Sequence, residues 1–353
     1  MVLLAGRRRV KEMLFFRNVG LALGTGYILF FCSERLFWSV FKPGDSVGEL
    51  AVTWLGYSTI AYWFLALIRW FEAESARAVL LAGACYGWMT EGMLVGTLYG
   101  TEDSAPFPLS VVCTGLSWHA LISVGVGWYA VQNCCRRGSS VSLVGWAVLL
   151  GVFWGVWATF LWSEKPPVRA AVGAFAGHAF VMGLLFLASH TVVCRLGVKR
   201  FHPGPLGLVL TGGILLVFYA QQVKTLGARP LVVLPVLLGA VVWAMSRGGR
   251  RDSAEKHQDE KEKDEDKTTS KASGDRVAER AAESKSRSGR AGWGLLLMPL
   301  TATLVYACLS RVEGWERVPV AKVLMYWVTA PVGAAMFVWA FCRSVLKEEK
   351  RRP

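Results

Sequence analysis

Ten stretches of mostly apolar residues alternate with short polar segments along the chain. A membrane-spanning helix needs roughly 20 apolar residues, because a rise of about 1.5 Å per residue must cross about 30 Å of hydrocarbon. The stretches cover residues 18–40, 51–69, 79–99, 109–132, 141–162, 170–194, 206–222, 231–246, 293–310 and 323–343. The seventh, eighth and ninth are the shortest. This pattern predicts an all-α, polytopic transmembrane helix bundle of about ten spans.

Composition supports a membrane location. Hydrophobic residues make up 54% of the 353 residues. This fraction is higher than in typical soluble proteins, so part of the apolar surface is expected to face lipid. Proline is expected to break or kink three of the predicted helices, at Pro235, Pro299 and Pro331. We therefore expect an integral, multi-pass protein of a cytoplasmic or plasma membrane.

The charges of the connecting segments predict the orientation. Lys and Arg are retained on the cytoplasmic side of a membrane protein, and they gather here at both chain ends and in alternate loops, whereas Glu102 and Asp103 lie in a loop without cations. The cations are Arg7, Arg8, Arg9, Lys11, Arg17, Arg136, Arg137, Arg195, Lys199, Arg200, Arg343, Lys347, Lys350, Arg351 and Arg352. The pattern predicts that both termini are cytoplasmic.

The basic N-terminus followed by an apolar run is also compatible with a cleaved signal peptide. That run continues from Asn18 through Cys32 into Ser33 and Glu34 without the small residues that a signal peptidase requires. We therefore interpret it as the first span.

The net charge of +14 does not indicate nucleic-acid binding, because the cations flank helices instead of sharing one folded face. The bilayer, with anionic headgroups on its cytoplasmic side, is the expected partner. The eight cysteines form no CxxC pair, so the sequence predicts neither a metal site nor a bound cofactor. Catalytic fingerprints such as G-x-S-x-G or H-E-x-x-H are also lacking in a suitable context.

One segment interrupts the apolar pattern. Residues 247–291 contain 13 Lys or Arg and 11 Asp or Glu, so they bury too little surface to offset the entropy of ordering and are predicted to be a disordered cytoplasmic linker. The linker separates residues 1–246, with about eight helices, from residues 292–353, with the last two helices and a basic tail. A solvated spacer and a docking segment for a protein partner are both open.

Ionisable side chains inside a bilayer are costly and often functional. Five fall within the predicted spans, between the midplane and the extracytoplasmic face: Glu34, Arg35, Glu91, His119 and His178. Glu34 and Arg35 also suit the membrane interface, where Arg35 would snorkel to headgroups.

Glu91 and His119 are expected to meet. Gly83, Gly87 and Glu91 recur every four residues, so they share one helix face. On the next span Gly115, His119, Ser123 and Gly127 do the same. A buried carboxylate and imidazole suit proton handling, while packing through hydrogen bonds is the structural alternative. Trp118, His178, Glu34 and Arg35 are predicted substrate contacts.

Other glycine spacings predict close helix packing. They are Gly20 and Gly24; Gly92, Gly96 and Gly100; Gly151 and Gly155; and Gly173 and Gly177.

Three function classes follow. The first is a proton-linked transporter or permease for a small solute or lipid, using Glu91 and His119 in an outward-facing cavity. The second is an intramembrane enzyme acting on a lipid-linked substrate from the extracytoplasmic side. The third is a non-catalytic scaffold or assembly factor that recruits a partner through residues 247–291.

Overall fold

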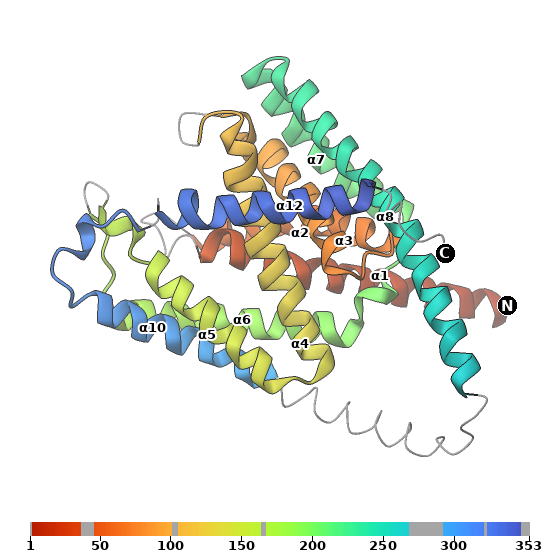
Figure 1. Ribbon diagram of the computed structural model, residues 1–353, viewed down its shortest axis with the longest axis horizontal. Coiled ribbons are helices and arrows are strands. Elements are labelled where there is room, and N and C mark those ends of the chain that lie inside the picture. The colour runs from red at the N-terminus through yellow and green to blue at the C-terminus, as the bar shows by residue number, and fades with distance from the viewer. Residues whose placement is uncertain are drawn as a thin grey trace, which may run out of the picture.

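The computed structural model describes residues 2–36, 46–100, 105–163, 167–267, 292–320 and 323–346 (Figure 1). Within these ranges every regular element is helical. Nine helical segments there are long and apolar enough to cross a membrane: Glu12–Arg35, Val47–Trp70, Ala76–Val95, Val111–Arg137, Ser140–Ser163, Val172–Leu196, Pro205–Leu226, Arg229–Gly248 and Val323–Val345. The predicted all-α, polytopic bundle is confirmed.

The longer elements follow one another along the chain with short turns between them. They are α1 (Val2–Phe30), η1 (Phe31–Arg35), α2 (Val47–Trp70), α3 (Ala76–Met89), η2 (Thr90–Val95), η4 (Val111–Ala130), α4 (Val131–Arg137), α5 (Ser140–Trp157), α6 (Val172–Leu196), α7 (Pro205–Leu226), α8 (Arg229–Lys267), α10 (Leu297–Leu309), η9 (Val323–Thr329) and α12 (Ala330–Val345). Short 3₁₀ turns complete the order: η3 (Thr97–Tyr99), η5 (Phe160–Ser163), η6 (Val198–Arg200), η7 (Gly292–Leu296) and η8 (Trp315–Arg317).

The ninth predicted span is shorter than expected. The apolar helix there covers Trp293–Leu309 and falls below the length of the other nine, and its first residues form the tighter turn η7. The seventh and eighth spans are longer than their apolar runs and cover Pro205–Leu226 and Arg229–Gly248. The structure thus contains nine full-length spans in its described part instead of ten.

The predicted prolines have different effects. Pro331 lies inside the span Val323–Val345, directly after the π-helix η9 changes to the α-helix α12. Pro235 lies inside α8. Pro299 lies near the start of α10 and faces α6, since a Cβ on Gly183 would come within 2.9 Å of its ring.

The backbone of α8 continues past the predicted end of the membrane region to Lys267. The first part of the predicted linker, residues 247–267, therefore continues this helix. Residues 268–291 lie outside the described residues, so the role of the segment stays a prediction.

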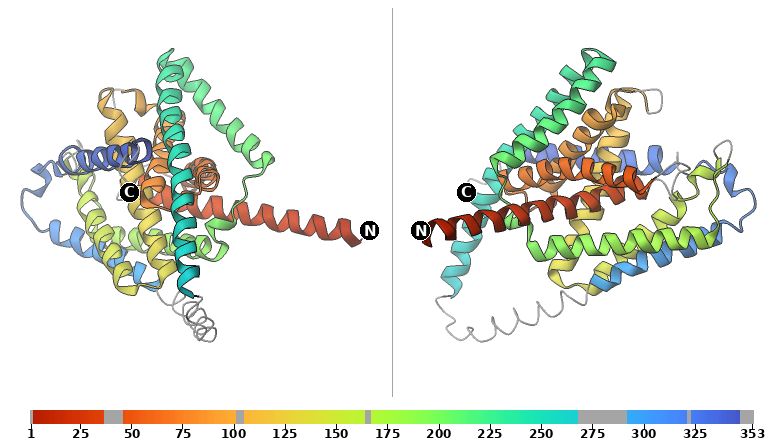
Figure 2. Two further views of the ribbon diagram at one scale, coloured as in Figure 1. Left: turned by 45° about the vertical axis from the view of Figure 1, so that its right-hand side comes forward. Right: turned by 180° about the vertical axis from the view of Figure 1, so that it is seen from behind.

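Helix η4 runs through the middle of the bundle. It makes its most extensive contacts with α3 and also packs on α12 and α1. Helices α5, α6 and α10 gather on one side of it, and α7 and α8 lie on the other side (Figures 1 and 2). The span containing α3 has the largest buried share of the nine and α7 the smallest. A polar group on α3 is thus placed in the interior.

Loops predicted to lie on one side of the membrane meet in the structure. Near the start of α3 and the end of α6, Glu74 pairs with Lys199 at 2.6 Å, and Arg77 donates to the carbonyl of Arg343 at the end of α12. Predicted outer segments meet elsewhere, where Arg169 pairs with Glu316 at 3.2 Å. This grouping agrees with the predicted topology.

Glycine packing against another helix is confirmed at five of the predicted positions: Gly20, Gly24, Gly92, Gly151 and Gly155. A Cβ at Gly24 would lie 3.0 Å from Val193 on α6, and a Cβ at Gly155 would lie 2.7 Å from Val305 on α10. The prediction is wrong at Gly173 and Gly177, where nothing lies within 4 Å.

Gly96 packs closely on α7, since a Cβ there would clash with the Gln222 side chain, but Gly96 and Gly100 do not form a helical stripe. Their φ angles of +89° and +75° end helical turns, so these glycines serve the backbone conformation and are not a packing stripe.

Candidate functional site

The site forms where α3 and η4 approach closely. A Cβ at Gly83 would lie 3.1 Å from Val124, and one at Gly87 would lie 2.8 Å from the His119 Cβ. Small residues on this stripe let two helix backbones come together. The predicted shared face of Gly83, Gly87 and Glu91 is therefore present and is turned toward His119.

Glu91 lies where the helix changes its winding. At Thr90 the α-helix α3 gives way to the π-helix η2, which ends at Gly96 in the left-handed conformation. Gly96 donates its backbone N–H to the carbonyl of Glu91 at 2.9 Å. π-Helical winding also forms η1, η4 and η9, so it does not by itself distinguish Glu91. This turn aims the carboxylate at η4.

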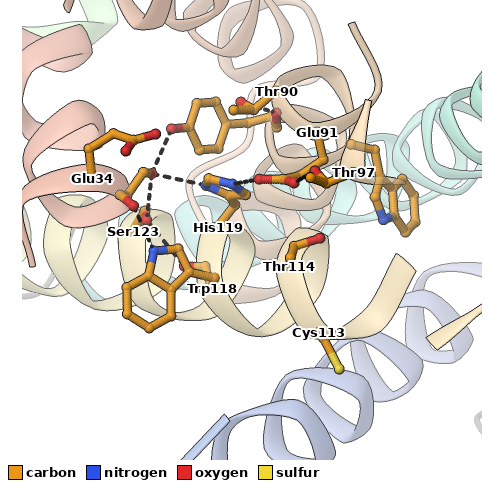
Figure 3. Close-up of polar contacts among 12 residues, drawn as sticks. Glu34, Thr90, Glu91, Thr97, Cys113, Thr114, Trp118, His119 and Ser123 are labelled. Carbon is orange, nitrogen blue, oxygen red and sulfur yellow. Dashed lines mark hydrogen bonds and ion pairs between the residues drawn. The ribbon is translucent and has the colours of Figure 1, made fainter. Parts of the chain in front are cut away.

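The carboxylate and the imidazole meet directly (Figure 3). Oε1 of Glu91 lies 2.5 Å from Nε2 of His119. The two residues are 9% and 2% exposed. The hydroxyl of Thr97 on η3 donates to the other carboxylate oxygen, Oε2. Both oxygens of Glu91 are thus engaged.

The second imidazole nitrogen continues the chain of hydrogen bonds. Nδ1 of His119 lies 2.9 Å from the hydroxyl of Ser33 on η1. Ser33 is also within hydrogen-bond distance of the Tyr86 hydroxyl, at 3.1 Å, and of the Ser123 hydroxyl, at 3.0 Å. The hydroxyl of Ser123 also lies 3.1 Å from the carbonyl of Trp118. Three spans therefore contribute to one buried polar network.

This network has two complete hydrogen-bonding arrangements. In the first, Glu91 is a carboxylate, His119 donates to it from Nε2, and Ser33 donates to Nδ1. In the second, the pair holds one more proton, His119 donates from Nδ1 to Ser33, and Ser33 donates to Ser123. Each arrangement satisfies the donors and acceptors that burial makes costly to leave unpaired. Both ring nitrogens of His119 therefore have a hydrogen-bond partner.

Two further predicted residues lie beside this network. Trp118 donates its indole N–H to the carbonyl of Ser33 at 3.1 Å and packs on Trp157, so it fixes the backbone that presents the Ser33 hydroxyl. Glu34 accepts a hydrogen bond from the Tyr57 hydroxyl at 2.8 Å. It lies on the far side of Tyr86 from Glu91.

Arg35 and His178 form a separate environment. Arg35 is 3% exposed, so it does not snorkel to the headgroups. His178 lies on α6 beside the Trp154 ring, at 6.3 Å between centroids, and interacts electrostatically with Arg35. Across the described residues, His178 contacts neither Glu91 nor His119. The predicted site residues therefore fall into two groups.

Sequence reasoning missed Ser33, Tyr86 and Thr97 as members of the site. Ser33 directly precedes Glu34 and Arg35, and Thr97 follows Glu91 by six positions. Hydroxyl residues are frequent in membrane helices, where they bond to their own backbone. Only their position relative to His119 distinguishes them.

The described residues contain no group of three or more His, Cys, Asp or Glu side chains that could hold a metal ion.

An apolar cleft lies on the opposite face of α3. It has a volume of about 750 Å³ between α2, α3, α7 and α8. Cys85, Met89 and Met93 line it. They lie on the other side of this helical span from Gly83, Gly87 and Glu91. Its other walls include Trp63, Leu67, Leu215 and Leu238.

In comparisons with known proteins, no protein-family model, no curated protein and no solved structure matches this chain.

Proposed function

We propose that this integral membrane protein binds and releases a proton at Glu91 and His119 and uses that step to move a small solute or a lipid across the membrane. The observation that carries the proposal is the buried contact of 2.5 Å between Glu91 and His119, with the second imidazole nitrogen bonded to Ser33 at 2.9 Å. An imidazole bonded at both nitrogens can take up a proton on one side and release it on the other.

Burial supports a functional role for this pair. Placing a carboxylate within a membrane span is costly, and such residues usually mark ion or proton pathways. A purely structural role needs only neutral hydrogen-bonding side chains, which bring two helices together at lower cost. Here Gly83 and Gly87 already provide the close approach, so packing does not require the ionisable pair.

The Thr97 contact gives the network a direction. Thr97 lies in the short turn η3 that leads out of the third span, on the side predicted to be extracytoplasmic. Its hydroxyl donates to Glu91, while Ser33 and Ser123 continue the network on the other side of His119. The proposed path runs from Thr97 through Glu91 and His119 to Ser33.

The apolar cleft favours a cargo with an apolar part. All of its lining residues except Phe71 come from membrane spans, and α7, which forms one wall, is the least buried of these spans. Movement of α7 and α8 relative to α3 is the proposed way in which protonation on one face of α3 affects the cleft on the other. Glu34, Arg35, Trp118 and His178 remain proposed cargo contacts.

The enzyme alternative requires a substrate atom to reach His119. Both of its nitrogens are occupied by Glu91 and Ser33, and the residue is 2% exposed. These contacts favour proton transfer within the network over attack on a lipid-linked substrate.

The first experiment is infrared difference spectroscopy of the purified protein during a change of pH. Wild-type protein is expected to show the carbonyl stretch of a buried carboxylic acid that appears on acidification, and Glu91→Gln to lack it. Glu316→Gln is the matched control, since Glu316 pairs with Arg169 on the surface. A spectrum that Glu91→Gln leaves unchanged would remove the carboxylate from proton handling.

The second experiment measures transport in proteoliposomes that contain a pH-sensitive dye. Candidate solutes and lipids are added under an imposed pH gradient, and the dye reports proton movement that depends on each. Glu91→Gln is expected to abolish the proton movement coupled to a cargo while the protein still folds. Full coupling in that variant contradicts the proposal.

A further inference from the structure

A second cleft opens at the end of the bundle where the predicted cytoplasmic loops meet. It has a volume of about 400 Å³ and lies between the ends of α2, α4 and α6. We call it the inner cleft. Its charged lining residues are the cations Arg69, Arg136, Arg137 and Lys199 and the carboxylates Glu72 and Glu74.

The floor of the inner cleft is buried and hydrogen-bonded. Val79, Trp128 and Val193 are buried there. Gln132, 3% exposed, has its amide nitrogen 2.9 Å from Nδ1 of His190 and accepts a hydrogen bond from the Cys194 thiol at 2.9 Å. These contacts join α4 to α6 beneath the cleft.

The cations keep most of their positive charge available. Arg136 donates to the side-chain oxygen of Asn133 at 2.5 Å, and Arg69 donates to the carbonyl of Phe201 at 3.2 Å. Both acceptors are neutral, so they orient the guanidinium groups without cancelling their charge. Lys199 pairs with Glu74 at 2.6 Å. With four cations against two carboxylates, the cleft carries excess positive charge.

We propose that the inner cleft binds a phosphate group, either in the headgroup of an anionic lipid or in a soluble phosphate compound. Guanidinium groups match the geometry of phosphate oxygens and form paired hydrogen bonds with them. Basic pockets between transmembrane helices on the cytoplasmic side bind phosphate-bearing headgroups. This inference does not depend on proton transfer at Glu91 and His119.

The cations of the inner cleft come from several elements. This distribution favours a role in ligand binding over a role only in setting the membrane orientation. A topological signal requires only cations near the ends of spans. Here cations from α2, α4 and η6 converge on one cleft, whereas Arg195 and Arg200 on the same side do not line it. These two arginines therefore provide a matched control.

The test measures the affinity of the full-length protein, in an uncharged detergent, for a water-soluble short-chain phosphatidylglycerol. Ligand that binds the folded state raises the unfolding temperature with concentration, which gives the dissociation constant. Short-chain phosphatidylcholine and inorganic phosphate are titrated in parallel. The variants are R137Q/K199Q and the control R195Q/R200Q, which removes the same charge.

We expect R137Q/K199Q to weaken phosphatidylglycerol binding about tenfold or more, because each cation near an anionic headgroup contributes roughly a factor of five. The control is expected to change the affinity about twofold or less, since exposed charges away from the ligand are screened. Competition by inorganic phosphate would assign the site to soluble phosphate compounds, and its failure would assign it to lipid.

Two results would overturn the proposal. One is equal binding of phosphatidylcholine and phosphatidylglycerol, and the other is an equal loss of affinity in both double variants. If R137Q/K199Q does not fold because Glu74 loses its partner, R136Q/R137Q replaces it with the same expected loss.

Discussion

The imidazole of His119 on η4 and the carboxylate of Glu91 on η2 lie 2.5 Å apart in the interior of the bundle. The contact joins two consecutive spans at the point where the helix of Glu91 widens into π-helical turns. It combines a close helix approach with an ionisable pair, and both features can be tested separately.

The energetic coupling of this pair is the first prediction. Either Glu91→Ala or His119→Ala leaves a buried polar partner unsatisfied and is expected to lower the free energy of unfolding by about 3–5 kcal/mol. The double variant is expected to lose less than the sum of the two, by about 1–3 kcal/mol. Denaturant unfolding of the four proteins measures the coupling.

The surface pair Arg169 and Glu316, at 3.2 Å, is the control for that cycle. Its coupling is expected to stay below about 1 kcal/mol, because solvent screens exposed ion pairs. Additive losses at Glu91 and His119 would show that the two side chains do not interact in the folded protein.

The approach of α3 to η4 is the second prediction. A methyl group added by Gly87→Ala would lie 2.8 Å from the His119 Cβ, so the helices must separate, at an expected cost of about 1–3 kcal/mol. Gly177→Ala is the control, since nothing lies within 4 Å of that site and alanine is the better helix former. Thermal unfolding of both variants distinguishes them. Equal stability of the two would contradict the close approach.

The third prediction concerns stability at high pH. Tyr99, 1% exposed, donates its hydroxyl to the carbonyl of Gly92 at 2.8 Å, and burial raises its pKa above the ordinary value of about 10. Above that pH the unfolded chain loses the proton while the folded chain keeps it, so the unfolded state binds fewer protons and stability falls as the pH rises. This contribution is fully present below about pH 10.

Tyr99→Phe is expected to reduce that loss of stability and to cost about 1 kcal/mol at neutral pH through the missing hydrogen bond. Unfolding free energies compared across alkaline pH provide the measurement. The same slope in wild type and Tyr99→Phe would argue against the raised pKa.

The fourth prediction concerns the orientation in the membrane. A cysteine replacing Arg200 is expected to react with an impermeant maleimide only in inverted vesicles, and one replacing Glu313 only in intact cells. The background would carry serine at the exposed Cys308 and Cys342. The reverse pattern of labelling would invert the topology and place Thr97 on the cytoplasmic side.

Much of the site follows from the sequence because it depends on helical periodicity. Gly87 and Glu91 on one span, and Gly115 and His119 on the next, lie one turn apart, so each pair faces one direction in any helix. Consecutive antiparallel spans joined by a short loop tend to be neighbours. The contact between Glu91 and His119 follows from these two facts.

Other features depend on distances between segments that are remote in sequence. Ser33 reaches His119 from the first span, 86 positions away, and no local pattern distinguishes it from other serines. Similarly, Gly173 and Gly177 have the spacing of a packing stripe and yet face open space. Spacing defines a helix face, but only the arrangement of all helices decides what that face meets.

The sequence by itself determined that this chain is a polytopic α-helical membrane protein, because the length and apolarity of each span are local properties imposed by the thickness of the bilayer. Tertiary structure decided which polar groups share an environment. It joined Glu91, His119, Ser33 and Thr97, placed His178 elsewhere, and gathered the cations of three elements around the inner cleft. Within a bilayer, packing, hydrogen bonds and lipid entropy drive helix association, and these depend on the whole bundle.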